Sequence, residues 1–394
     1  MLRRYASLIV DVGANVQPGQ IVGVLAEPRA APLVRAIAEA AYERGAKFVD
    51  VWYFDPQVKR IRLERAREDT LGFVPPWFAG RLLALGEEHS ARITIAPVVP
   101  PGTLDGIDAA RAGRDALPAL AEAFGVINAQ TTNWTLSPWP TPDWARLVHP
   151  GLDDGAALAE LWRQLAFVLR LDEPDPAQSW RARLRELQDA AARVSAAGFD
   201  ALRFDGPGTE LKVGLLPTSR FVGGTTKTVD GVEHAPNIPT EEIAATPDPK
   251  RADGVVTATK PLDISSTVVR GLRVRFEGGR AVEIDADENA GALRARASAD
   301  DGGSRLGEVA LVDRESRIGK TGTVFFNTLL DENAASHIAL GNGYAVGVGR
   351  EDVARINTSA IHIDFMIGGD EVTVTGITRD GREVPVLRAG SWQL

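Results

Sequence analysis

The pattern of apolar and polar residues at positions 20–53 predicts a strand, a helix and a second strand. Apolar runs cover residues 21–26 and 48–53, and the segment between them repeats apolar residues with the spacing of one helix face. The positions on that face are Leu33, Ile37, Ala40 and Ala41. Gly45 stands where the residue after a helix often adopts a left-handed conformation. This order of elements predicts two parallel strands connected by a helix.

The alternation of helices and strands continues to about residue 130. A helix is predicted near residues 77–88, a strand at 93–99 and a further helix at 116–124. Such alternation indicates a mostly parallel sheet covered by helices. Residues 131–150 are rich in Trp and Pro, and we expect them to form an irregular, packed connection.

Two helices are predicted next, at residues 156–169 and 177–196. Pro174 and Pro176 separate them, because proline cannot continue a helix. This segment has the features of a domain junction.

Beyond residue 199 short apolar runs alternate with turn residues, which predicts a β-rich region. The clearest turn signals are at residues 206–208, 276–279 and 380–381. The predicted fold class is therefore α/β, with two domains. Residues 1–185 form a parallel-sheet α/β domain with a helical connection, and residues 186–394 form a β-rich α+β domain that carries the candidate site.

The composition of the chain limits its expected partners and the types of metal ligand it can offer. Its net charge of -9 gives no general attraction to nucleic acid or to anionic lipid, and no segment approaches the roughly 20 apolar residues that span a membrane. We therefore expect no nucleic acid or membrane partner and a cytoplasmic location. The chain has no cysteine, so a bound metal would need histidine and carboxylate ligands.

The predicted strand at residues 361–367 offers two potential metal ligands. Because side chains alternate along a strand, His362 and Asp364 share one face while Ile363 and Phe365 point toward the core. Divalent ions accept an imidazole nitrogen together with a carboxylate oxygen. A buried histidine hydrogen-bonded to a nearby aspartate is an equally common structural arrangement, so the pair alone leaves both interpretations open.

His337 is one of only five histidines. It follows an apolar run at residues 325–330 that predicts a strand, and Asp331 is expected to cap a short helix that ends at Gly341. His337 would project from the second turn of that helix. Taken alone, such a histidine is more often an ordinary surface or core residue than a metal ligand.

Two acidic segments complete the candidates. Glu308 is the only acid in the predicted strand at residues 305–312, and burying its carboxylate requires a cation or a metal, unless it faces water at an edge. Glu241 and Glu242 follow Thr240, an arrangement that also suits the start of a helix. Neither segment is decisive alone.

Other catalytic patterns are not supported. Gly319-Lys320-Thr321 resembles the end of a phosphate-binding loop, but Arg314 stands where the first glycine belongs. The chain has neither a G-x-S-x-G elbow nor an H-E-x-x-H helix. A serine hydrolase or a zincin is therefore unsupported.

Four sequence blocks, taken in order, resemble the thermophilic metallo-aminopeptidases, a family that includes aminopeptidase T, aminopeptidase S and PepS. The blocks are residues 237–242, 305–311, 330–339 and 357–364. The resemblance implies a metal site made by Glu242, Glu308, His337, His362 and Asp364, with Tyr344 as an active-site phenol. It further implies two divalent ions, most often zinc or cobalt with manganese or magnesium as alternatives, peptide substrates with a free N-terminus, and a homodimer.

The resulting hypothesis is a metal-dependent aminopeptidase that releases N-terminal amino acids from peptides by means of a water activated between two metal ions. Glu242 or Asp364 is the expected bridging ligand, and Tyr344 the expected donor to the oxyanion. Glu308, ahead of Glu241, is the expected general base.

Two alternatives stand beside this hypothesis. One is a metal-dependent amidase or dipeptidase that acts on small molecules, and the other is a non-catalytic metal-binding structural protein. Residues 347–356 look shorter than their counterpart in the family, which we expect to affect substrate access.

Overall fold

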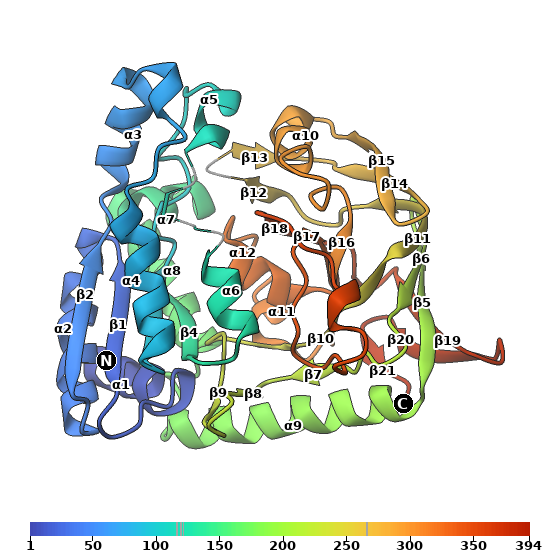
Figure 1. Cartoon of the computed structure of the whole chain (residues 1–394), viewed down its shortest axis with the longest axis horizontal. Helices are drawn as coiled ribbons and strands as arrows, with labels where there is room; N and C mark the ends of the chain where they lie inside the picture. Colours follow the sequence, from blue (N-terminus) through green and yellow to red (C-terminus); the bar gives the residue numbers. More distant parts are fainter. Residues whose placement is uncertain (116, 119, 121, 265–266) are drawn as a thin grey trace. The chain divides into compact units, whose positions relative to one another are not determined.

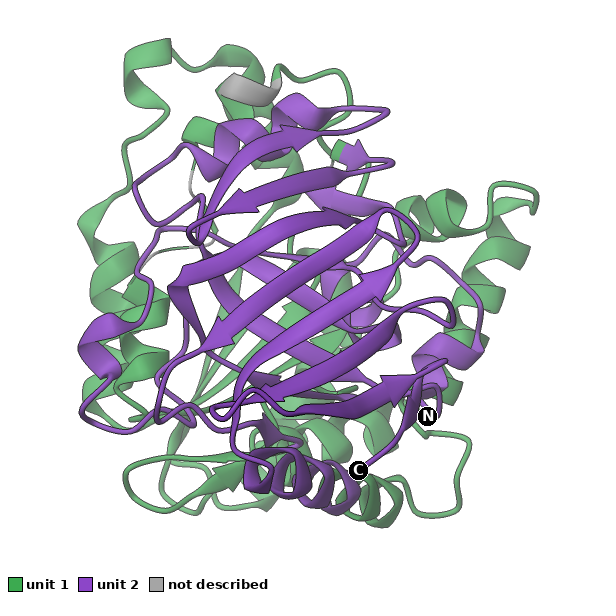
Figure 2. Cartoon of the chain, turned by 90° about the vertical axis from the view of Figure 1, so that its right-hand side faces the viewer, with its two compact units in different colours: residues 1–184, 225–240, 265–267 green, residues 185–224, 241–264, 268–394 purple. Residues whose placement is uncertain are grey.

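The structure is a computed structural model of the chain that describes residues 1–115, 117–118, 120, 122–264 and 267–394. The chain forms two compact units, which Figure 2 distinguishes by colour. The first contains Met1–Leu184, Thr225–Thr240 and Ser265–Thr267, and the second contains Arg185–Gly224, Glu241–Ile264 and Val268–Leu394. The division into two domains at residues 185–186 stays a prediction.

The first unit contains a four-stranded parallel sheet in the order β2-β1-β3-β4. Its strands are β1 (Ile21–Ala26), β2 (Phe48–Tyr53), β3 (Ala91–Ala96) and β4 (Asn133–Pro138). Figure 1 shows α2 (Ala31–Glu43) and α4 (Pro76–Glu87) on opposite sides of this sheet. This arrangement follows from right-handed connections that lead to the two neighbours of β1 in opposite directions.

The strand–helix–strand unit predicted at residues 20–53 is confirmed. The apolar face of α2 is buried, and Gly45 has a φ of 85° just beyond the end of the helix. The strand predicted at 93–99 begins and ends earlier, as β3. Part of the helix predicted at 116–124 lies outside the described residues, and α6 covers Glu122–Asn128.

The irregular connection predicted at residues 131–150 is wrong. This segment forms β4, which pairs along its whole length with β3, and α7 (Pro142–Val148). Its prolines are tolerated because Pro138 ends the strand and Pro142 begins the helix, where a missing N–H costs nothing.

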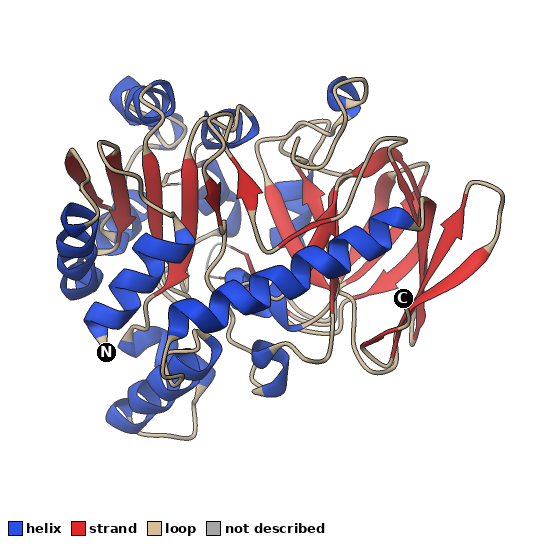
Figure 3. Ribbon diagram, turned by 90° about the horizontal axis from the view of Figure 1, so that it is seen from below, coloured by secondary structure: helices blue, strands red, loops and turns tan. Residues whose placement is uncertain are grey.

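The first unit contains several further helices and a short hairpin. They are α1 (Leu2–Leu8), α3 (Pro56–Arg65), α5 (Ala109–Arg114), α8 (Asp154–Val168), β8 (Thr226–Lys227) and β9 (Glu233–His234). The long helix α9 (Pro176–Ala196), seen along its length in Figure 3, contains the boundary between the units. Among the described residues, no helix combines the length and the apolar character needed to cross a membrane.

The second unit is built on two antiparallel sheets. The eight-stranded sheet has the order β15-β14-β11-β6-β5-β19-β20-β21. Its strands are β5 (Phe199–Gly206), β6 (Thr209–Leu215), β11 (Pro247–Thr257), β14 (Arg273–Glu277), β15 (Arg280–Asp285), β19 (Thr373–Thr378), β20 (Glu383–Arg388) and β21 (Ser391–Trp392). The turn signals predicted at residues 206–208, 276–279 and 380–381 lie at hairpins of this sheet.

The five-stranded sheet has the order β18-β17-β16-β10-β7. Its strands are β7 (Val222–Gly223), β10 (Glu242–Ala245), β16 (Leu306–Val312), β17 (His337–Gly341) and β18 (His362–Met366). Apolar side chains of both sheets, such as Phe204 and Phe365, belong to one buried cluster. Short elements beside these sheets are β12 (Leu262–Ile264), α10 (Ala290–Ala297), α11 (Arg317–Lys320) and α12 (Thr328–Asp331). The predicted α/β class, with an N-terminal parallel sheet and a β-rich C-terminal part, is confirmed.

Candidate metal centre

The candidate ligands lie on one face of the five-stranded sheet. Glu308 pairs with Ala339, and Ala339 pairs with Asp364, so these residues form a row across β16, β17 and β18. Paired residues, and residues two apart along a strand, point to the same face of a sheet. The other candidate ligands on this face are His337, His362 and, on the neighbouring strand β10, Glu242.

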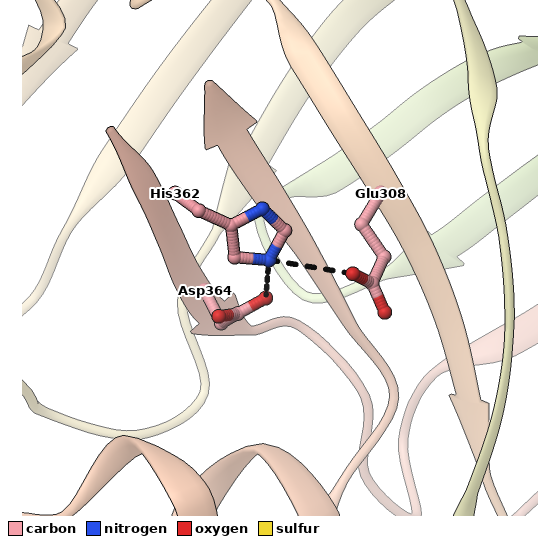
Figure 4. Close-up of side chains that lie close together, drawn as sticks. All are labelled: Glu308, His362 and Asp364. Atoms are coloured by element: carbon pink, nitrogen blue, oxygen red, sulfur yellow. Dashed lines mark ion pairs between the residues drawn. The ribbon is translucent and has the colours of Figure 1, made fainter. Parts of the chain in front are cut away.

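Two imidazole rings converge on the carboxylate of Asp364. Its Oδ1 lies 3.3 Å from Nε2 of His362 and 3.9 Å from Nε2 of His337. Each ring also faces a second acid: Glu308 Oε2 is 3.3 Å from His362 Nε2, and Glu242 Oε2 is 3.2 Å from His337 Nε2. Figure 4 shows Glu308, His362 and Asp364 pointing toward a common point. The structure thus brings all five candidate ligands together.

Both rings are oriented by main-chain carbonyl groups. Nδ1 of His337 lies 3.2 Å from the oxygen of Ala335, and Nδ1 of His362 lies 2.7 Å from the oxygen of Asn342. A proton on each Nδ1 satisfies these contacts and leaves each Nε2 with a free lone pair toward the carboxylates. This is the tautomer that a metal-binding histidine requires.

The acids of the centre fit a bound cation. Oε2 of Glu242 is buried and has no hydrogen-bond partner among the residues that the structure describes, although an imidazole nitrogen is close. Burial raises the pKa of Glu242 to about 7, because a charged carboxylate without compensation is costly inside a protein. A divalent ion would supply the missing partner and charge.

The two imidazoles respond to the surrounding acids. Burial lowers the pKa of His337, but the carboxylates of Glu242 and Asp364 outweigh that effect and raise the pKa above its usual value. The pKa of His362 is likewise raised well above its usual range by Tyr344 and Asp364, against the effect of burial. Burial raises the pKa of Asp364, yet the imidazole of His362 brings it below the ordinary value. Positive charge is therefore favoured at this centre.

Glu332 is a further acid at this centre, and it was not among the residues predicted from the sequence. It lies on a short 3₁₀ turn, Glu332–Ala334, and is 9% exposed. Burial, together with the nearby Asp364 and Glu242, raises its pKa well above the usual value. Its position within the matching block at residues 330–339, five residues before His337, was the available signal.

The local structure predicted around His337 is wrong. His337 is the first residue of β17, and a helix does not extend from Asp331 to Gly341. The strand predicted at residues 325–330 is also absent. The carboxylate of Asp331 accepts hydrogen bonds from the main-chain nitrogens of Phe325 and Asn327, at 2.8 and 3.0 Å, and these bonds hold a turn in place of the strand.

The pair of acids at residues 241 and 242 does not start a helix. Glu242 is the first residue of β10, which pairs with β16, so it is not at the N-terminus of a helix as predicted. Glu241 is 1% exposed, and its carboxylate lies 3.4 Å from the main-chain nitrogen of Arg317.

Tyr344 lies beside the centre. Its ring centroid is 4.9 Å from that of His362, and the hydroxyl of Thr246 donates a 2.6 Å hydrogen bond to its main-chain oxygen. Burial raises the pKa of the phenol, so the hydroxyl keeps its proton at neutral pH. A protonated phenol can donate a hydrogen bond.

Comparisons with known proteins agree with this chemistry. A family model described as thermophilic metalloprotease (M29) matches residues 1–392. The chain is 41% identical to aminopeptidase T of Thermus aquaticus over 401 residues, which cover 99% of this chain and 98% of the relative. It is 36% identical to aminopeptidase 2 of Geobacillus stearothermophilus over 403 residues, covering 99% and 97% of the two chains. The solved structure of wild-type AmpT from Thermus thermophilus matches with a TM-score of 0.89 and 39% identity, covering 100% of this chain and 99% of that one.

Proposed function

Because the chain belongs to the thermophilic metalloprotease (M29) family and its relatives are aminopeptidases, it is a metal-dependent aminopeptidase, and we propose that it acts with two divalent ions. The predicted hydrolase and exopeptidase activity is thus confirmed. The relatives do not favour the amidase or the structural alternative. The number of ions, their identity and their ligands are the parts that we propose.

The position of Asp364 between two imidazoles carries the proposal of two ions. His337 and Glu242 would hold one ion, His362 and Glu308 the other, and Asp364 would bridge them. Charge supports this count: the carboxylates of Glu242, Glu308, Glu332 and Asp364 carry four negative charges when ionised, which equal the charge of two divalent ions beside neutral histidines. Of the bridging candidates, Asp364 is favoured because its Oδ1 faces both rings.

The donor set suits zinc or cobalt. Imidazole nitrogens mixed with carboxylate oxygens are typical of these ions, whereas magnesium prefers a shell of oxygen ligands. Manganese and magnesium remain the alternatives to be compared by experiment.

Bound ions of this kind polarise a scissile carbonyl and lower the pKa of a coordinated water. The residues around them would complete the reaction. Tyr344 would donate a hydrogen bond to the oxygen that becomes negatively charged, and Glu308 would accept the proton released by the attacking water. Peptides with a free N-terminus are the proposed substrates, because a free amine is a metal ligand and an acylated one is not.

The proposal is tested with protein stripped by a chelator and reloaded with zinc, cobalt or manganese. Release of free amino acid is measured from unblocked dipeptides and from their N-acetylated forms. We expect cleavage of unblocked peptides only, restored by about two equivalents of metal per chain. Cleavage of both forms would contradict the role of the free amine, and full activity with one equivalent would contradict the second ion.

Asp364→Asn tests the bridging role. We expect the variant to lose activity by at least about a thousandfold and to bind one ion in place of two. Asp370→Asn is the matched control, because Asp370 is an exposed aspartate in the same unit. Retention of two ions by Asp364→Asn would overturn the assignment of Asp364 as the bridge.

We further propose that the protein is a homodimer located in the cytoplasm, as the family resemblance and the sequence led us to expect. Light scattering of the purified protein tests the oligomeric state, with a monomer mass as the contrary outcome. Cell fractionation tests the location.

A further inference from the structure

A small cavity in the first unit carries a charge arrangement that is unrelated to the metal centre. It lies against the face of the parallel sheet that α4 covers, and it is a partly open hollow with about 30 Å³ of free space, enough for about two water molecules or an anion of a few heavy atoms. Its charged lining residues are Asp50, Arg81 and Arg92. Its apolar walls include Trp52, Leu82 and Leu85.

The sheet register explains why these charges meet. Asp50, Gly23 and Arg92 form a row across β2, β1 and β3, so the side chains of Asp50 and Arg92 point to the same face. Gly23, between them, has no side chain, and Cδ1 of Leu85 lies 2.8 Å from the place where its Cβ would be. Helix α4 therefore approaches the sheet closely here and forms one wall of the cavity.

The two arginines differ in their partners. Arg81 makes a bidentate pair with Asp50, with Nε–Oδ2 and Nη2–Oδ1 distances of 2.8 and 2.5 Å, and its guanidinium lies 5.6 Å from the ring centre of Trp52. Arg92 has no such carboxylate: its Nη1 is buried and has no hydrogen-bond partner within the part of the chain that the structure describes. The negative charge of Asp50 is thus already matched by Arg81.

An arginine in this state lacks a counter-charge. Burial lowers the pKa of Arg92 to about 10, which still leaves the guanidinium charged at neutral pH. Arg92 as a whole is partly exposed, but a guanidinium nitrogen that is buried without a partner is costly, and a planar carboxylate fits the donor geometry of a guanidinium. The adjoining leucine and tryptophan side chains would contact a short apolar group.

We propose that this cavity is a binding site for a small carboxylate anion, such as acetate. Its oxygens accept hydrogen bonds from Arg92, and its methyl group lies against the apolar wall. Arg81 is already neutralised by Asp50, so Arg92 supplies the unmatched positive charge. The site is separate from the metal ligands, all of which belong to the second unit.

Isothermal titration of the metal-loaded enzyme with sodium acetate, at an ionic strength held constant with sodium chloride, tests the proposal. We expect saturable binding that weakens at least about tenfold in Arg92→Met, because the hydrogen-bonding cation is removed. Binding of acetate at the metal centre is the same in both proteins and cancels from the comparison. Equal binding by wild type and Arg92→Met would overturn the proposal.

Asp50→Asn gives a result of opposite sign. It removes the negative charge that neutralises Arg81, so the cavity gains a second unmatched cation, and acetate binding should tighten by about threefold to tenfold. Weaker binding in this variant would contradict the charge argument.

If Arg92→Met does not fold, Arg92→Lys replaces it in the titration: it keeps the charge and should retain part of the affinity. Chloride that competes as strongly as acetate would overturn the assignment to a carboxylate. Peptidase activity should stay unchanged in all these variants, since none alters a metal ligand.

Discussion

His362 is oriented by the main chain of Asn342: its Nδ1 lies 2.7 Å from the Asn342 carbonyl oxygen. The same oxygen lies beside Gly307, where an added Cβ would stand 2.2 Å from it. A glycine is required at position 307 because this carbonyl occupies the space that a side chain would take. The residue next to Glu308 therefore also fixes the ring of His362.

Gly307→Ala should displace that carbonyl and loosen His362. We expect metal affinity to fall by about tenfold and the free energy of unfolding to fall by about 1–3 kcal/mol. Metal affinity is measured by competition with a chromogenic chelator, and stability by urea denaturation. Gly291→Ala is the control, because a Cβ at Gly291 meets nothing within 4 Å. Unchanged metal affinity in Gly307→Ala would show that the carbonyl does not orient the ring.

Glu332→Gln should affect stability and activity in opposite directions. In metal-free protein the substitution removes an acid that is crowded by Asp364 and Glu242, so the thermal midpoint should rise by about 1 °C, as for a gain of about 1 kcal/mol in a chain of this length. Activity of the metal-loaded enzyme should fall, because one of four charges that match the ions is lost. The exposed Glu371 provides the control, Glu371→Gln. A lower midpoint for the metal-free variant would argue against electrostatic crowding.

Tyr344→Phe removes the proposed donor and keeps the ring that contacts His362. We expect kcat to fall by about a hundredfold or more, with little change in metal affinity or KM. Steady-state kinetics on an unblocked dipeptide separate these quantities. Tyr42→Phe changes an exposed tyrosine and should have no effect. A rise in KM at constant kcat would instead indicate a role in substrate binding.

His234 should make stability depend on pH. It is 3% exposed, and burial lowers its pKa from 6.5 to about 4. Between these values the unfolded chain binds a proton that the folded chain does not, so stability falls as the pH drops from 6.5 to 4, by about 3 kcal/mol in total. Urea unfolding at a series of pH values should show a shallower decline for His234→Gln. The same slope in both proteins would mean that the folded protein accommodates the charged ring.

Structural features that depend on neighbouring residues could be predicted from the sequence. His362 and Asp364 could be placed on one face because alternation along a strand is a local property. The pairing of Glu308, Ala339 and Asp364 could not be predicted, since register between strands depends on contacts distant in sequence. His337 was assigned to a helix for the same reason: the capping potential of Asp331 was visible, but its hydrogen bonds to Phe325 and Asn327 were not.

The family resemblance supplied what local patterns could not. It grouped five residues from separate segments before any register was known. Glu332 was not among the residues that the resemblance implied, although it lies inside a matching block. No local signal distinguishes a buried acid from an exposed one in a short turn. The effect of the loop at residues 347–356 on substrate access stays a prediction.

Ala339 stands between Glu308 and Asp364 in the row across the sheet. Its methyl group lies on the same face of the sheet, between the two acids. Neighbouring strands are about 4.8 Å apart, so the backbones of the two acids are about 10 Å apart. Their side chains extend toward each other above Ala339. The spacing of the two carboxylates is consequently set by backbone hydrogen bonds within one sheet. Sequence changes in the surrounding loops can thus alter which peptides enter while the dimensions of the reacting centre stay constant.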